Sequence, residues 1–396
     1  MELLSLYHVP LVGYFAVIAA LLAAVAPTFA PRRLNTPAVG FLALAVVSLA
    51  FTWTHMIRYF RRSFEDSAHR HGVLPHLYSS HAWLADVSLF HEAWHYVCDG
   101  ARRWWWSQQL CMWTTGPLTL LFMADSRKYG VKRVWAYMLL GQLVAISFAQ
   151  SLWAAAAVVA ASSVHAGASS ASTPAVRARL RRPEISVGLV AAIIVGSASV
   201  VFVPRTLASG SRLFLPNLVF MHTVILLPFI PAFAARDWRI RPRLSRLYLN
   251  FAFVALRFRA PVLIELLGKH QPFSVEVIRD RIPALLAQQW ETAMEHPAQA
   301  SISWDVVFTS VSALTYLAWS ARSPAAGVRR AEQVAWPILA LMAAATPLVG
   351  IATSVSVGLA IREGKREARE DAEEKVEKAR REQAVRELQG LGKKDQ

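Results

Sequence analysis

The sequence is poor in cysteine and in charge. It contains two cysteines, Cys98 and Cys111, which are too few for a disulfide framework or a cysteine-based metal site. Charged residues make up 17% of the chain, whereas soluble domains carry about 25%. Hydrophobic residues reach 55%. These proportions argue against a small disulfide-stabilised secreted domain and indicate a chain that is surrounded by lipid.

Motifs for nucleotide chemistry are also missing, because the chain has neither a G-x-G-x-x-G segment nor a P-loop. The net charge of +16 could suggest a nucleic-acid partner. However, no basic face interleaved with aromatic side chains for base stacking is present. Outside the tail, the basic residues cluster between apolar segments, as the positive-inside rule describes for membrane proteins. We therefore expect membrane lipids, and no nucleic acid, as partners.

Long apolar segments define the expected fold. A helix needs about 20 apolar residues to cross the hydrocarbon core of a bilayer. We predict an all-α, polytopic membrane helix bundle with about eight transmembrane helices. The predicted spans are Leu11–Ala30, Ala38–Ile57, Trp104–Ala124, Val134–Ala161, Ile185–Pro204, Leu213–Ala235, Ser301–Ser320 and Val334–Ile361.

The chain divides into a bundle over 1–361 and a charged tail over 362–396. Within the bundle we expect an interfacial segment near 76–103 and an extramembrane loop over 236–300. The apolar stretch Tyr248–Gly268 is assigned to an interfacial helix, because Arg257 and Arg259 would be costly inside a bilayer. The tail has 11 basic and 10 acidic residues, which favours a solvated helix or disorder.

The basic residues beside the spans predict the orientation. With eight spans, one side receives Arg32–Arg33, Arg127–Arg133, Arg205–Arg212 and Arg322–Arg330. The other side receives the larger set, which is Arg58–Arg62, Arg102–Arg103, Arg177–Arg182, Arg236–Arg246 and the tail. We therefore expect a multi-pass protein of the endoplasmic reticulum membrane with both termini in the cytosol.

The densest polar chemistry lies between Phe90 and Trp106. His91, Glu92 and His95 match H-E-x-x-H, in which two histidines one helical turn apart bind zinc and the glutamate activates water. Asp99, one turn further, is the candidate third ligand. A membrane zinc metalloprotease is therefore one alternative. An alternative interpretation, in which the segment has no catalytic role, is an interfacial helix with tryptophans at the membrane boundary.

Acidic groups beside aromatic rings suggest a third chemistry. Ionisable residues in or near spans are functional candidates because they are costly there. Asp305 opens a predicted span, where desolvation would favour its protonated form, although an acid at a helix N-terminus needs no function. Aromatic faces stabilise carbocations by cation–π attraction. A proton donor among tryptophans therefore suits protonation and cyclisation of an isoprenoid.

Three segments resemble fungal integral-membrane terpene cyclases of meroterpenoid biosynthesis, of the macrophorin and ascofuranone type. The central segment is V-W-A-Y-M-L-L-G-Q-L-V-A-I-S-F-A-Q-S-L over Val134–Leu152, and the last is W-D-V-V-F-T-S over Trp304–Ser310. The first includes the acid and tryptophan of L-F-x-E-x-W. Its quoted residues are Leu89, Phe90, Glu92, Trp94, Arg102, Trp104, Trp105, Gln108, Gln109, Leu110, Trp113 and Thr114.

The resemblance implies proton-initiated cyclisation of a farnesylated, in some cases epoxidised, precursor in secondary metabolism, without metal or other cofactor. Glu92 or Asp305 would donate the proton and the other carboxylate would orient it or take up the final proton. A prenyltransferase and an epoxidase would supply the substrate. A transporter or scaffold remains a second alternative. The candidate substrate-binding and cation-stabilising residues are Trp94, Trp104, Trp105, Trp113, Arg102, Gln109 and Gln142.

Overall fold

The computed structural model describes residues 9–30, 34–168, 184–208, 212–230, 239–268 and 277–391. Helices dominate these residues, and the only strands among them are the two-residue β1 (Ile185–Ser186) and β2 (Arg239–Ile240), which pair antiparallel. The prediction of an all-α membrane helix bundle is confirmed.

Helices in the first half of the chain are α1 (Val9–Val25), η1 (Ala26–Phe29), α2 (Thr36–Arg70), η3 (Pro75–Leu77), α3 (Ser80–Asp86), α4 (Leu89–Cys98), α5 (Gly100–Trp113), η4 (Thr114–Leu118), α6 (Thr119–Tyr129), α7 (Val134–Leu143), α8 (Ile146–Ala168) and α10 (Val187–Ala208). The second half contains α11 (Phe214–Val224), η5 (Leu227–Phe229), α13 (Leu244–Leu267), η6 (Val277–Arg281), α14 (Ile282–Met294), α15 (Pro297–Arg322), η7 (Pro324–Ala326), η8 (Arg330–Glu332), α16 (Trp336–Val349) and α17 (Ile351–Leu391).

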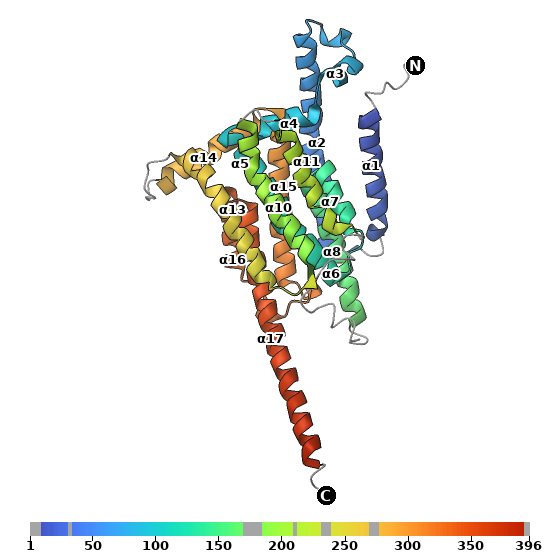
Figure 1. Cartoon of the computed structure of the whole chain (residues 1–396), viewed down its shortest axis with the longest axis vertical. Helices are drawn as coiled ribbons and strands as arrows, with labels where there is room; N and C mark the ends of the chain where they lie inside the picture. The colour runs from blue at the N-terminus through green and yellow to red at the C-terminus, as the bar shows by residue number, and fades with distance from the viewer. Residues whose placement is uncertain are drawn as a thin grey trace.

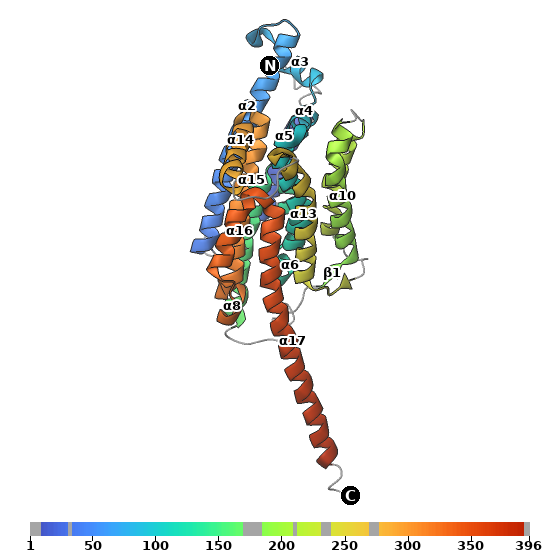
Figure 2. The ribbon, with the colours of Figure 1, turned by 90° about the vertical axis from the view of Figure 1, so that its left-hand side faces the viewer.

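The long helices lie roughly parallel to one axis (Figure 1). The end of α2 and the short α3 project from one end of the bundle, and α17 leaves it at the opposite end (Figures 1 and 2). Helix α4 lies across the α3 end. Helix α1 also begins at the α3 end, whereas the outer half of α17 lies at the opposite end (Figure 1). The expected cytosolic location of both termini stays a prediction, because the terminal residues lie outside the described part of the chain.

Six helices of the described residues are long and apolar enough to cross a membrane, fewer than the eight predicted. They include Leu244–Leu267 (α13), which the sequence analysis assigned to an interfacial helix within an extramembrane loop. Arg257 is exposed and Arg259 is buried against α5 and α16, which provides the partners that a buried cation needs. Helix α15 has 26 residues but is too polar to be counted among the six.

Two predicted spans are broken into hairpins. Val134–Ala161 divides into α7 and α8, which meet at Val144 and Ala145. Val334–Ile361 divides into α16 and α17 at Gly350, whose φ of 83° is strained for a residue with a side chain. Apolar composition alone could not reveal either break, because apolar residues continue directly on both sides of each break.

Because of these breaks, the basic residues do not divide between the two ends of the bundle as the eight-span prediction expects. Arg329 forms an ion pair of 2.8 Å with Glu373 of α17, although the eight-span prediction places them on opposite sides. Glu184 likewise accepts hydrogen bonds from both Arg127 and Arg241. Basic residues from both predicted sets are therefore together at the α17 end.

Helix α8 forms the centre of the bundle. Ala154–Ala157 are fully buried, and their small side chains allow α2 and α15 to approach closely. Trp153 stacks on Phe122 with ring centroids 4.5 Å apart and donates a 2.8 Å hydrogen bond to Ser126. A buried indole N–H needs such an acceptor.

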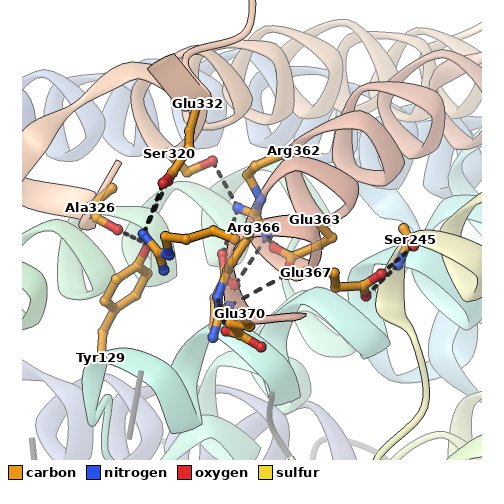
Figure 3. A network of polar contacts seen from close by, with 12 residues as sticks. Tyr129, Ser245, Ser320, Ala326, Glu332, Arg362, Glu363, Arg366, Glu367 and Glu370 are labelled. Atoms are coloured by element: carbon orange, nitrogen blue, oxygen red, sulfur yellow. Dashed lines mark hydrogen bonds and ion pairs between the residues drawn. The ribbon is translucent and has the colours of Figure 1, made fainter. Parts of the chain in front are cut away.

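The inner half of α17 is fixed by buried ions (Figure 3). Arg362 donates to both oxygens of Asp125 of α6, at 2.9 and 3.1 Å, and to Ser320 at 2.8 Å. Tyr316 donates to the same carboxylate at 2.7 Å. Asp125 is 1% exposed, so its charge requires these partners. The predicted tail is thus part of one 41-residue helix that starts inside the bundle.

We predict that Gly358→Ala destabilises the protein by about 1–3 kcal/mol, because its methyl group would lie 2.3 Å from Cδ2 of the fully buried Leu317. Gly364→Ala, in the same helix, meets only Cβ of Ser245 at 3.8 Å and should be neutral or stabilising by up to about 1 kcal/mol. Thermal unfolding of the purified protein in detergent compares the two. Equal midpoints for both variants would contradict this packing.

Candidate functional site

Asp305 closes the N-terminus of α8 inside the bundle. Its carboxylate accepts backbone N–H groups from Ile146 at 3.1 Å and Ser147 at 2.7 Å. The side chain is buried, and Thr309 lies at 3.5 Å from one carboxylate oxygen. The first N–H groups of a helix have no partner within it and carry its positive dipole end. Asp305 thus satisfies groups that lipid could not.

Asp305 does not open its own helix, as the sequence analysis expected. Helix α15 begins at Pro297, so Asp305 lies in its third turn. The polar residues before Ser301 belong to this helix, and Gln299 donates a 3.1 Å hydrogen bond to Ser303 within its buried face. The acid serves another helix, and only the fold reveals this.

The α7–α8 break is also tied to α5. Trp113 donates a 2.7 Å hydrogen bond to Gln150 of α8, and Gln150 donates a 3.1 Å bond to the carbonyl of Thr309. All three residues are buried. Trp113 is therefore held by its N–H group in the core, between the first and the central segments of the resemblance.

Gln142 and Trp94 both contact His222, which lies between them. The Nδ1 atom of His222, on α11, is bonded to Oε1 of Gln142 on α7. The ring centroid of His222 is 5.8 Å from that of Trp94 on α4. The other ring nitrogen, Nε2, is buried without a hydrogen-bond partner among the described residues. Trp94, His222 and Gln142 thus form one cluster from three helices.

Glu92 lines a hollow at the α4 end of the bundle. Its volume is about 270 Å³, and its walls are His91, Glu92, His95, Tyr96, Asp99 and Arg103. Helix α4 is held there by a 2.9 Å bond from Tyr59 of α2 to the carbonyl of Leu89. The two sequence-predicted acids therefore lie in different surroundings: Glu92 faces this hollow, and Asp305 is enclosed.

The histidines of H-E-x-x-H do not join Asp99 in a ligand set. The rings of His91 and His95 are 5.9 Å apart and both meet the edge of Phe214. Helix α4 ends at Cys98, so Asp99 is not a further turn of the same helix. In the described part of the chain, no three histidine, cysteine or acidic side chains are placed to hold a metal ion. The alternative metal set is not assembled.

Several predicted residues lie away from the hollow. The guanidinium of Arg259 lies 3.3 Å from the ring centroid of Trp105, so this face is not open to a carbocation. Trp104 is buried, and Gln109 donates to the carbonyl of Trp105 at 3.0 Å. Arg102 is exposed outside the hollow, which its neighbour Arg103 lines instead.

Four residues that form a cluster at the hollow were missed by sequence reasoning. Arg103 stacks over Tyr96 at 3.9 Å and bonds Glu295 at 2.8 Å, and Tyr96 stacks on His296 at 4.0 Å. Glu295 and His296 are distant in sequence, so nothing in the pattern around Tyr96 indicated this cluster. His222 was noted only as one ionisable residue near a span.

Comparison with known proteins adds no assignment. No family model matches the chain, no curated protein is similar to it, and no solved structure matches its fold. The resemblance to fungal terpene cyclases therefore depends only on the residues quoted above.

We predict that Asp305→Ala destabilises the protein by about 2 kcal/mol or more, because two buried N–H groups lose their acceptor. Asp305→Asn keeps one carbonyl oxygen and should lose less than half as much. The exposed Asp66 of α2 provides the control, since Asp66→Ala removes only a 3.7 Å surface ion pair with Arg62. Unfolding midpoints test this, and an unchanged midpoint for Asp305→Ala would rule out the capping role.

Proposed function

We propose that the chain is a membrane-bound terpene cyclase that protonates and cyclises a farnesylated precursor, or its terminal epoxide, in secondary metabolism. One observation carries the proposal: the three segments of the resemblance meet around the α7–α8 break. Trp94 and Gln142 each contact His222, Trp113 bonds Gln150, and Asp305 caps α8. No cofactor is required for this chemistry.

Glu92 is the proton donor in this proposal. It faces an open hollow, where a carboxyl group can reach a substrate. Asp305 already accepts two backbone N–H groups, one at each oxygen, so a proton on either oxygen would compete with a bond that holds α8. Asp305 is accordingly a positioning residue that fixes the break from which Gln142 reaches His222.

Trp94 is the aromatic residue best placed to stabilise a cation. It is partly buried two residues after Glu92 in α4, outside the walls of the hollow and beside His222, and no guanidinium of the described residues covers its ring as Arg259 covers that of Trp105. Cation–π attraction is strongest with tryptophan and grows when water is excluded. His222, with its free ring nitrogen beside Trp94, is placed to accept the final proton.

The membrane setting suits such a substrate. A farnesyl chain dissolves in the bilayer, and α4 lies at the end of the bundle, where the predicted interfacial segment would meet the headgroups (Figure 1). We place the protein in the endoplasmic reticulum membrane with α17 in the cytosol, because basic residues gather at the α17 end. A prenyltransferase and an epoxidase would supply the substrate.

We predict that Glu92→Gln lowers cyclisation of a farnesylated phenol, or of its terminal epoxide, by at least about 100-fold, since general-acid catalysis contributes this much. The amide has nearly the same shape and cannot donate an acidic proton. Glu291→Gln, an exposed glutamate of α14 at the same end, should retain activity. Product isomers are measured by mass spectrometry in membranes with equal protein content. Full turnover by Glu92→Gln would remove Glu92 from the mechanism.

We also predict that Trp94→Leu lowers turnover at least tenfold while Trp94→Phe retains part of it, because only the aromatic variant keeps a π face. Both variants reduce the side-chain volume, so the pair separates cation stabilisation from packing. The product distribution is read in the same assay. Equal activities in the two variants would show that the ring acts only by filling space.

A second candidate function is transport, which is favoured by the two helical hairpins that turn inside the bundle. Transport sites are commonly built from discontinuous helices that end inside the membrane. Here α7–α8 and α16–α17 both turn within the bundle. Uptake of the unchanged farnesylated phenol into vesicles that contain the protein, with no isomer formed, would favour transport over cyclisation.

A further inference from the structure

A large cavity lies where α17 leaves the bundle, at the end opposite to Glu92. Its volume is about 1070 Å³, which is enough for a small organic ligand. The walls come from α17, the end of α6, the end of α15 with the segment that follows it, and the β2 region. They include Lys128, Arg241, Ser320, Arg329, Arg362 and Arg366.

Most carboxylates of this cavity are already neutralised. Glu363 lies between two arginines of its own helix, Arg362 at 2.8 Å and Arg366 at 3.4 Å. The network is visible in Figure 3. The other pairs are Glu332 with Arg369 at 3.0 Å, Glu370 with Arg366 at 3.2 Å, Glu373 with Arg329 at 2.8 Å and Glu377 with Arg381 at 2.5 Å.

Lys128 differs from the arginines of this cavity because it has no ion-pair partner among the described residues. It is 6% exposed, yet among the described residues no carboxylate lies within ion-pair distance of its ammonium group. Its Nζ atom lies 4.8 Å from the ring centroid of Tyr129, which is a weak substitute. Lys128 is beyond the apolar part of α6, at the polar end of the bundle. Burial and the nearby Arg366 lower the pKa of its amine to about 7, although the more distant carboxylates of Asp125 and Glu363 act in the opposite direction.

We propose that this cavity binds a ligand that carries a phosphate group and that Lys128 receives the phosphate. A buried ammonium group without a counter-ion is costly, and an anion in the cavity would remove that cost. Lysine is a compact point charge that commonly binds phosphate. Arg241 and Arg329 line the same cavity, although each already has a carboxylate partner.

The pairing of the charged residues in the cavity walls favours an anion over a cation as the ligand. The five carboxylates named above hold arginines, so a cation bound at any of them would have to displace an existing ion pair; Glu374 is the remaining acidic residue of the walls. A phosphate would instead add a partner to Lys128 and leave the network of Figure 3 intact. The source could be a soluble phosphate compound or a phospholipid headgroup, since both present the same group to the cavity.

The test uses the full chain in phosphatidylcholine nanodiscs. Pyrophosphate at millimolar concentration should raise the unfolding midpoint on the order of 5 °C relative to chloride at equal ionic strength. Replacing part of the lipid with phosphatidic acid forms the second arm. A rise with pyrophosphate indicates a soluble ligand, and a rise with phosphatidic acid alone indicates a headgroup.

Lys128→Met should abolish either rise, whereas Lys128→Arg should keep it. The exposed Lys132 follows α6 closely and gives the matched control, so Lys132→Met should respond like the unaltered protein. No rise in either arm, or an equal rise in Lys128→Met, would overturn the proposal.

A second measurement needs no variant that could fail to fold. Lys128 of the unaltered protein should be acetylated by acetic anhydride at pH 8, because a large part of its amine is then neutral. The anion identified in the first experiment should reduce this acetylation severalfold, as measured by peptide mass spectrometry. Acetylation of Lys132 should not change. Equal acetylation of Lys128 with and without the anion would contradict the site.

Discussion

The bond between Asp305 and the N-terminus of α8 is the constraint on which the rest of the bundle depends. A helix that starts inside an apolar bundle exposes N–H groups that neither lipid nor water can satisfy. Asp305 supplies both acceptors from α15. Because α8 can start there, α7 can turn back beside it. This turn between α7 and α8 brings Gln142 to His222 and Gln150 to Trp113.

In the second hairpin, α16–α17, a positive charge satisfies a helix C-terminus. Helix α16 stops at Val349, and its last carbonyl groups need donors. Arg259, which is 2% exposed, donates to the carbonyl of Leu348 at 3.1 Å and to that of Trp105 at 2.6 Å. An acid thus holds a helix N-terminus and a cation holds a helix C-terminus, as the macrodipole favours. The burial of Asp305 and Arg259 is explained by the helix ends that they satisfy.

The sequence was sufficient for the fold class but not for the path of the chain. Runs of apolar residues predicted a helical membrane protein, and this is confirmed. They could not locate the breaks at Val144 and Gly350, since apolar residues continue directly on both sides of each break. For the same reason Arg259 was taken as a sign of an interface, although its partners lie on α5 and α16, far away in sequence.

The candidate site shows the same limit. The acids and tryptophans were found because such residues are costly in lipid, which is a local property of the sequence. Their grouping is not local. Trp94 meets His222 across 128 positions of sequence, and Trp105 is covered by Arg259. Residue type identified the candidates, and only the fold separated Glu92, which faces a hollow, from Asp305, which holds a helix.

The most direct measurement is photolabelling by a farnesylated phenol with a photoreactive group on its terminal isoprene unit. The account predicts labelled peptides from α4 and from the α7–α8 break, and loss of label when the unmodified phenol competes. Labelling confined to other helices, or label that the unmodified phenol does not displace, would contradict a site at Glu92 and Trp94.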